Sequence, residues 1–209
     1  MNYLFTIGTL LLSAQVSLSQ AQTNQAPYTM ELRAHRSVSG ADYRILIVRG
    51  AKSVKLRYFR LDSIRAKLYT DATYRALAAT LENKQPAAER EMAARQLVAL
   101  FDKYKVYRHE SLQLRTASNG PFVQLLDSIY QASPAQLKAR EANTFHIVLD
   151  GTDVQLLVKA TGTPDKEVYA QSPGPTSHPE LYRLLHQSLE LYRQQRPQGF
   201  LDTRYTGGY

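Results

Sequence analysis

The stretch YRILIVRGAKSVKLRY, residues 43–58, decides the fold class of this chain. Ile45 to Val48 form a continuous apolar run, which is typical of a strand that is buried on both faces. After a turn at residues 50–52, apolar and basic residues alternate from position 54 to position 58. A period of two is that of a strand with one buried and one solvated face. The stretch therefore predicts a β-hairpin and, with it, an antiparallel sheet.

The segments on either side of this hairpin show strand and helix patterns in turn. Upstream, apolar residues at every second position of residues 30–36 predict another strand. Downstream, residues 64–68 fit either a further strand or the first turn of a helix. Thr70-Asp71 is typical of a helix cap and predicts a helix that ends near Glu82. A second helix is expected over residues 86–105, with a proline in its first turn.

The second half of the chain repeats this order with fewer basic residues. Strands are predicted at residues 111–115, 145–150, 154–158 and 166–170. Helices are predicted to begin near Asn119 and in the capping boxes that Ser133 forms with Gln136 and Ser177 with Glu180. The inward-facing residues of the last helix are expected to be Leu181, Leu184, Leu185, Ser188 and Tyr192.

These patterns together predict an α+β fold, in which antiparallel β-hairpins pack against amphipathic helices. Because strand, hairpin and helix occur in a similar order twice, an internal duplication of a ββββα-like unit is one interpretation. Two unrelated α+β halves are the other. We place the first half, with the basic hairpin, at residues 22–108 and the second half at residues 109–196. The tail at residues 197–209 shows no periodicity, and we expect it to be mobile.

Residues 1–21 have the pattern of a secretory signal peptide. Leu4 to Leu12 form a short apolar core, and Ser19-Gln20-Ala21 offers small residues at both recognition positions of a cleavage site. The core is far shorter than the roughly 20 residues that span a bilayer, so we expect cleavage and no transmembrane segment in the mature chain. No Lys or Arg precedes the core, which leaves a buried N-terminal segment as the alternative. The chain lacks cysteine, and this favours a bacterial periplasm or medium among the exported locations.

The positive charge of the chain is concentrated in one segment. The formal net charge is +8, and residues 33–67, with ten basic and two acidic residues, account for all of it. Such asymmetry points to an anionic partner, either an envelope polymer or an acidic protein. The alternative is a solvated sheet face that only keeps the protein soluble. The predicted basic patch consists of Arg44, Lys52, Lys55, Arg57 and Arg60.

No motif in the sequence specifies a catalytic site. A nucleophilic serine elbow, a Ser-x-x-Lys pair and a phosphate-binding glycine loop are all absent. His186 and Glu190 are the only pair with the spacing of two metal ligands on a helix, and this spacing is more typical of a surface pair. We therefore predict no metal and no cofactor, and we do not expect an exported protein to bind nucleic acid.

The leading hypothesis is a non-enzymatic, exported binding module that holds an anionic ligand through its basic hairpin. One alternative is a structural or assembly protein of the cell envelope, in which the hairpin edge or the apolar helix faces pair with another subunit. The other is a small hydrolase with a site between the two halves. Its candidate residues are His109, His146, His178 and His186.

Overall fold

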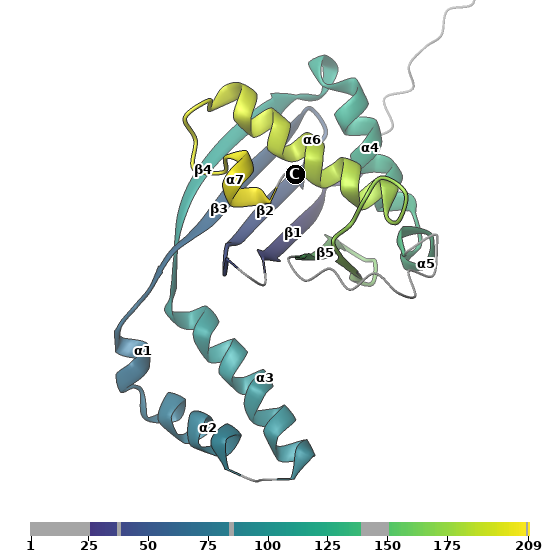
Figure 1. Cartoon of the computed structure of the whole chain (residues 1–209). Coiled ribbons are helices and arrows are strands. Elements are labelled where there is room, and N and C mark those ends of the chain that lie inside the picture. The colour runs from purple at the N-terminus through teal and green to yellow at the C-terminus, as the bar shows by residue number, and fades with distance from the viewer. Residues whose placement is uncertain (1–25, 37–38, 84–85, 139–150, 208) are drawn as a thin grey trace, which may run out of the picture.

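The computed structural model describes residues 26–36, 39–83, 86–138, 151–207 and 209. The predicted signal peptide at residues 1–21 and the predicted strand at residues 145–150 lie outside the described residues. Six strands form one antiparallel sheet in the order β4-β3-β2-β1-β5-β6 (Figure 1). The strands are β1 (Tyr28–Arg36), β2 (Asp42–Arg49), β3 (Ser53–Ile64), β4 (Lys105–Arg115), β5 (Thr152–Ala160) and β6 (Lys166–Gln171).

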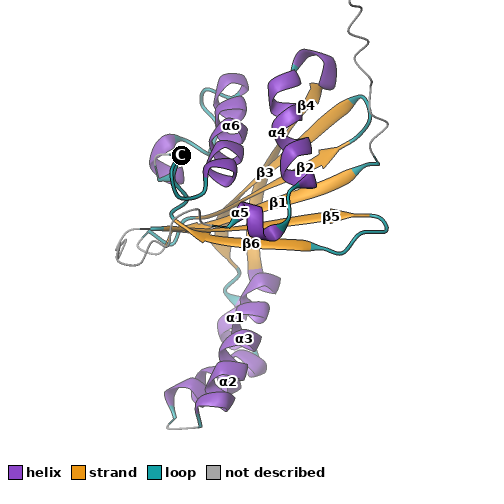
Figure 2. Ribbon diagram, turned by 90° about the vertical axis from the view of Figure 1, so that its right-hand side faces the viewer, coloured by secondary structure: helices purple, strands orange, loops and turns teal. Residues whose placement is uncertain are grey.

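Seven α-helices accompany the sheet in the described residues, so the α+β prediction is confirmed. Two long helices, α4 and α6, lie on the same face of the sheet (Figure 2). The helices are α1 (Lys67–Thr70), α2 (Ala72–Glu82), α3 (Ala87–Tyr104), α4 (Gly120–Gln131), α5 (Pro134–Leu137), α6 (Pro179–Gln195) and α7 (Thr203–Thr206). In the part of the chain that the structure describes, none of them combines the length and the apolar character needed to span a bilayer.

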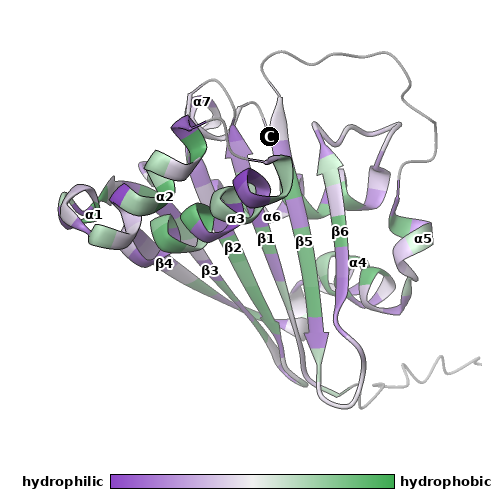
Figure 3. Cartoon of the chain, turned by 90° about the horizontal axis from the view of Figure 1, so that it is seen from below, coloured by the Kyte–Doolittle hydropathy of each residue, from purple (hydrophilic) through white to green (hydrophobic). Residues whose placement is uncertain are grey.

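The period of two in the strands separates a covered face from an open face of the sheet. Tyr43, Ile45 and Ile47 of β2 are fully buried, whereas Arg44 and Leu46 between them are only partly buried. Consecutive side chains of a strand point to opposite faces, so the buried set lies beneath α4 and α6. The same alternation of apolar and polar residues runs along the neighbouring strands (Figure 3). We call the side of the sheet opposite α4 and α6 the open face.

The covered face is closed by apolar stripes on both helices and by a few buried polar contacts. The Tyr58 hydroxyl donates to the backbone carbonyl of Ser188 in α6, at 2.7 Å. The Tyr28 hydroxyl donates to the Asp127 carboxylate of α4, also at 2.7 Å. The inward residues predicted for the last helix are confirmed, and they are Leu181, Leu184, Leu185, Ser188 and Tyr192.

The segment between β3 and β4 projects away from the sheet, and we call its residues 67–104 the arm (Figure 1). It holds α1, α2 and α3, and these helices pack mainly against one another. At its base the Arg65 amide donates to the Tyr104 carbonyl, at 2.9 Å. The predicted cap is confirmed, because the Asp71 side chain accepts from the Thr73 amide at the start of α2. Residues 64–68 form no further strand, because β3 continues to Ile64; α1 begins at Lys67, in agreement with the alternative of a first helical turn.

The C-terminal residues pack onto the fold, which differs from the mobile tail that the sequence predicts. Leu201 is fully buried, and the Phe200 amide donates to the hydroxyl of Tyr192, at 2.8 Å. Arg193 of α6 donates to the Leu201 carbonyl at 3.3 Å and to the Thr206 hydroxyl at 2.7 Å. These contacts are the physical reason why the segment folds back against α6 instead of extending into solvent.

Two further predictions on the second half are corrected or refined by the structure. The predicted capping box at Ser177 is wrong, because α6 begins at Pro179 with His178 as its N-cap. The Ser177 hydroxyl accepts instead from the Gly174 amide, at 3.0 Å. The predicted boundary at residues 108 and 109 falls inside β4, and one sheet includes strands of both halves. The duplication itself stays a prediction.

Candidate functional site

The five residues of the predicted basic patch lie in three different places. Arg44, Lys55 and Arg57 belong to the open face of β2 and β3, where Arg44 lies opposite Phe59 and Arg57 opposite Leu46. Lys52 is exposed in the turn between these strands, before β3 begins. Arg60 has the same parity as the buried Tyr58, and its side chain therefore lies on the covered side of the sheet.

Arg60 serves the packing of the C-terminal segment. Its guanidinium lies 4.8 Å from the centroid of the Tyr205 ring and donates to the Phe200 carbonyl at 3.3 Å. Together with Arg36 and Tyr205 it lines a cleft of about 480 Å³ at the end of the sheet. The Tyr205 hydroxyl donates in turn to the Asp42 carbonyl, at 3.2 Å. Arg60 is thus separated by the sheet from the three basic residues of the open face.

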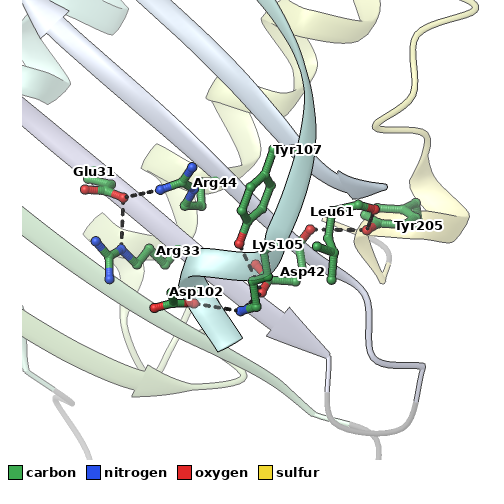
Figure 4. Close-up of polar contacts among 9 residues, drawn as sticks. All are labelled: Glu31, Arg33, Asp42, Arg44, Leu61, Asp102, Lys105, Tyr107 and Tyr205. Atoms are coloured by element: carbon green, nitrogen blue, oxygen red, sulfur yellow. Dashed lines mark hydrogen bonds and ion pairs between the residues drawn. The ribbon is translucent and has the colours of Figure 1, made fainter. Parts of the chain in front are cut away.

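The open face gains a basic residue that the predicted patch omits. Arg33 of β1 lies directly opposite Arg44 of β2 in the strand register. Glu31, two residues before Arg33, approaches both guanidinium groups, at 2.9 Å from Arg33 and 3.6 Å from Arg44 (Figure 4). The hydrogen bond to Glu31 raises the pKa of Arg33. One carboxylate is therefore shared by two permanently charged groups, and a net positive charge remains on this part of the face.

Aromatic rings hold Arg44 in place. The carbon of its guanidinium lies 4.4 Å from the centroid of the Tyr107 ring and 4.8 Å from that of Phe59. Cation–π contacts of this kind contribute about 0.5–1 kcal/mol each at exposed sites and more when desolvated. The side chain of Arg44 is 31 % exposed. It is thus partly accessible from solvent and already restrained before any ligand binds, which reduces the entropy lost on binding.

An ion-pair cluster at the end of this face joins the arm to the sheet. Lys105 contacts the Asp42 carboxylate at 2.7 Å and the Asp102 carboxylate of α3 at 3.1 Å (Figure 4). Burial acts to lower the pKa of Lys105, but the hydrogen bond to Asp42 and the charge of that carboxylate outweigh it and raise the pKa. The ammonium group therefore stays protonated at neutral pH and cannot serve as a base or nucleophile there. The cluster is a structural link between α3 and β2.

The histidines of the hydrolase alternative do not converge in the part of the chain that the structure describes. His109 lies on the open face of β4, beside Phe59. His186 belongs to α6 and His178 is the N-cap residue of that helix, both on the other side of the sheet, and His186 forms the expected surface pair with Glu190 at 3.8 Å. His146 lies outside the described residues. Among the described side chains no three His, Asp or Glu residues are grouped so as to hold a metal ion.

His178 has a polar neighbour but an environment that favours its neutral form. Its Nδ1 lies 3.2 Å from the Ser177 hydroxyl. Burial lowers the pKa of His178, so the ring is mainly neutral at pH 7. The Ser177 hydroxyl is 3.0 Å from the Gly174 amide, which donates to it and holds it in the loop before α6. This pair closes the loop before α6, and it has the contacts of a structural element.

The open face therefore has the features of a binding surface: fixed cations, aromatic rings and an extended shape across several strands. The sequence predicted Arg44, Lys55 and Arg57 on it but missed Arg33, Glu31 and the two rings that hold Arg44. The signal that finds Arg33 is the register between β1 and β2, which the positions of the two strands already suggest. Comparisons with protein-family models, with curated proteins and with solved structures gave no match to this chain.

Proposed function

We propose that this protein is an exported binding module that holds an anionic envelope polymer on the open face of its sheet. One observation carries the proposal: Arg33 and Arg44 lie directly opposite each other on neighbouring strands of an exposed face. Like charges in this position destabilise a sheet, and Glu31 compensates only one of them. A bound anion would relieve this repulsion, so its binding to the folded protein is favoured.

The spacing of the cations supports a ligand with repeated charges. Neighbouring strands are about 4.8 Å apart, and residues two positions apart on one strand are separated by about 7 Å. Lys55 and Arg57 lie on the same face of β3, with Leu46 and Val48 of β2 opposite them. The charges thus form a shallow grid over three strands. A chain of phosphate or carboxylate groups can meet several points of this grid, whereas one small anion can meet only one or two.

Export belongs to the same proposal, because the predicted signal peptide at residues 1–21 would bring the mature chain into contact with the polymer in the periplasm or medium. A long-range attraction by the basic segment would also raise the association rate at low ionic strength. An acidic protein is the competing partner. It would present its charges at irregular spacing and would have to match the apolar residues between the cations as well.

The test is salt elution of residues 22–209 from a column of a linear polyphosphate. The variant K55Q/R57Q removes two charges from the open face. The control R90Q/K103Q removes the same residue types from exposed positions of α3, outside that face. We expect the K55Q/R57Q variant to elute at clearly lower salt than the control and to bind with a weaker dependence on salt.

Equal shifts of the two variants would contradict the proposal, because only net charge would then matter. Circular dichroism of all three proteins checks that the fold is unchanged. Capture of an acidic protein with no affinity for the polyphosphate would favour the competing partner. The same variants are also run on a poly-glutamate column, in which carboxylates replace the phosphates. The salt needed for elution from the two columns then shows whether the open face prefers a phosphate polymer or an acidic polypeptide.

A further inference from the structure

The arm exposes more large apolar side chains than the rest of the described chain. Four such residues are more than half exposed, and three of them lie on the arm: Tyr69 at 55 %, Met92 at 58 % and Val98 at 64 %. Within the arm, α2 has no buried residue, and α3 buries only Ala93 and Leu100. The three exposed residues lie on α1 and on two different sides of α3, and Val98 is the most exposed of them.

We propose that the arm pairs with the arm of a second copy of this chain, so that two α2–α3 hairpins form a four-helix bundle. Two antiparallel helices alone leave each helix with one neighbour, and much of each apolar face stays in water. In a bundle of four, every helix has two neighbours. The pairing would therefore bury apolar surface that the arm of one copy exposes, as the hydrophobic effect favours.

The sequence of α3 supplies the second apolar stripe that such a bundle needs. Its first stripe, through Ala93, Leu97 and Leu100, is the part of the helix that is buried or partly buried. Ala94 and Val98 are exposed and spaced by four residues, and they form a second stripe beside it; the partly buried Phe101, whose ring centroid is 6.0 Å from that of Tyr74 in α2, lies between the two stripes. The small side chain at position 94 permits close approach of another helix. Apolar residues along α2 and α3 are visible in Figure 3.

Charge favours a second copy over an acidic or basic partner. Residues 67–104 contain six basic and five acidic residues, a net charge of +1. Because the whole chain carries +8, the rest of the sequence carries +7. The sheets with their covering helices, which carry this charge, repel each other in two copies. Two nearly neutral arms, with basic and acidic residues in similar numbers, do not. The arm also projects from the sheet, so two arms can overlap while the two sheets stay apart (Figure 1).

The size of the arm predicts a weak dimer. α2 and α3 have 11 and 18 residues. At about 1.5 Å per residue and with axes about 10 Å apart, they offer a face of roughly 400–500 Å² per copy. Two copies together then bury roughly 800–1,000 Å², which is at or just below the lower limit for a specific interface. Identical surfaces pair about a two-fold axis, so the assembly closes at two copies.

Sedimentation velocity of the mature chain, residues 22–209, tests the pairing over protein concentrations of about 1 to 300 μM. We expect the sedimentation coefficient to rise from that of a monomer to that of a dimer. V98D places a charge on the second stripe and should keep the protein monomeric at every concentration. Q96D adds the same charge at an exposed position on the opposite side of α3 and should dimerise as the wild type does.

Two outcomes would overturn the proposal. One is a wild type that sediments as a monomer over the whole range, which would leave the arm to a different partner. The other is a V98D variant that dimerises with the affinity of the wild type, which would place the contact elsewhere. Position 98 is 64 % exposed, so the substitution leaves the packing of the monomer intact, and circular dichroism verifies this. The result is independent of polyanion binding, because no residue of the open face is changed.

Discussion

The body of the protein, which is the sheet with α4 and α6, differs from the arm in what stabilises its helices. α4 and α6 bury five and six residues against the sheet. The arm contains α3, the longest helix, and yet only three of its described residues, Leu68, Ala93 and Leu100, are buried. In the body, helices are fixed by tertiary packing, which supplies most helical stability in proteins. In the arm, they depend on caps, on each other and, as we propose, on a second copy.

Core truncations should show the largest contrast between these regions. We expect Leu185→Ala in α6, which is fully buried, to lower the free energy of unfolding by about 3 kcal/mol, because it leaves a cavity beneath the sheet. Leu97→Ala in α3, where the leucine is only partly buried, should cost about 1 kcal/mol. Urea unfolding followed by circular dichroism at low protein concentration measures both. Equal losses would mean that the arm is as tightly packed as the body.

The next largest loss of stability is expected at the ion-pair cluster that joins the two regions. Lys105→Met removes the cation between Asp42 and Asp102 and should destabilise the protein by about 1 kcal/mol, because the largely buried Asp42 carboxylate then lacks its cation. Since the pKa of Lys105 is raised, its contribution is present at neutral pH and is lost only as pH rises through that folded value. Lys103→Met, at an exposed position of α3, is the control. Thermal unfolding at neutral pH distinguishes the two variants.

The smallest effect concerns the first turn of α2 and depends on pH. The hydrogen bond from Tyr104, at 2.5 Å, and that from the Thr73 amide lower the pKa of Asp71 from its ordinary value of 3.8. A lowered folded pKa contributes stability above the unfolded value, and this contribution is lost as pH falls through the folded value. We therefore expect Asp71→Asn to be less stable than wild type at neutral pH, and the difference to disappear in acid.

Tyr104→Phe tests the cause of this effect. It removes the main hydrogen bond to Asp71, so the pKa of Asp71 should move up towards its ordinary value, as carboxylate chemical shifts in an NMR titration would show. An unchanged titration in this variant would assign the shift to the backbone amide of Thr73 alone.

The elements of the fold were largely predictable from the sequence because their signals are local. The alternation at residues 54–58, the cap at Asp71 and the stripe of α6 each lie within a few residues. The Ser133 capping box is also confirmed. The box at Ser177 was wrong because the same residue types also close a loop, and here the hydroxyl accepts from Gly174.

The candidate site was predicted less well because its contacts join distant segments. Lys105 and Asp42 are 63 residues apart in the sequence, and no local pattern pairs them. Arg60 was grouped with Lys55 and Arg57 by proximity in the chain, although the period of two places it on the other face. Likewise, a single leucine at position 201 gives no periodic signal, so the packed C-terminal segment was missed. Export and polymer binding stay predictions.

The way the chain enters and leaves the arm has a consequence for how this protein can change. Ile64 and Lys105 are paired in the sheet, and the next residues towards the arm, Arg65 and Tyr104, are joined by a backbone hydrogen bond. The arm therefore stands where a β-hairpin would have its turn. It can be shortened, lengthened or exchanged for another helical insert without altering strand order or register. The body would keep its fold, while the insert alone would decide which assembly the protein joins.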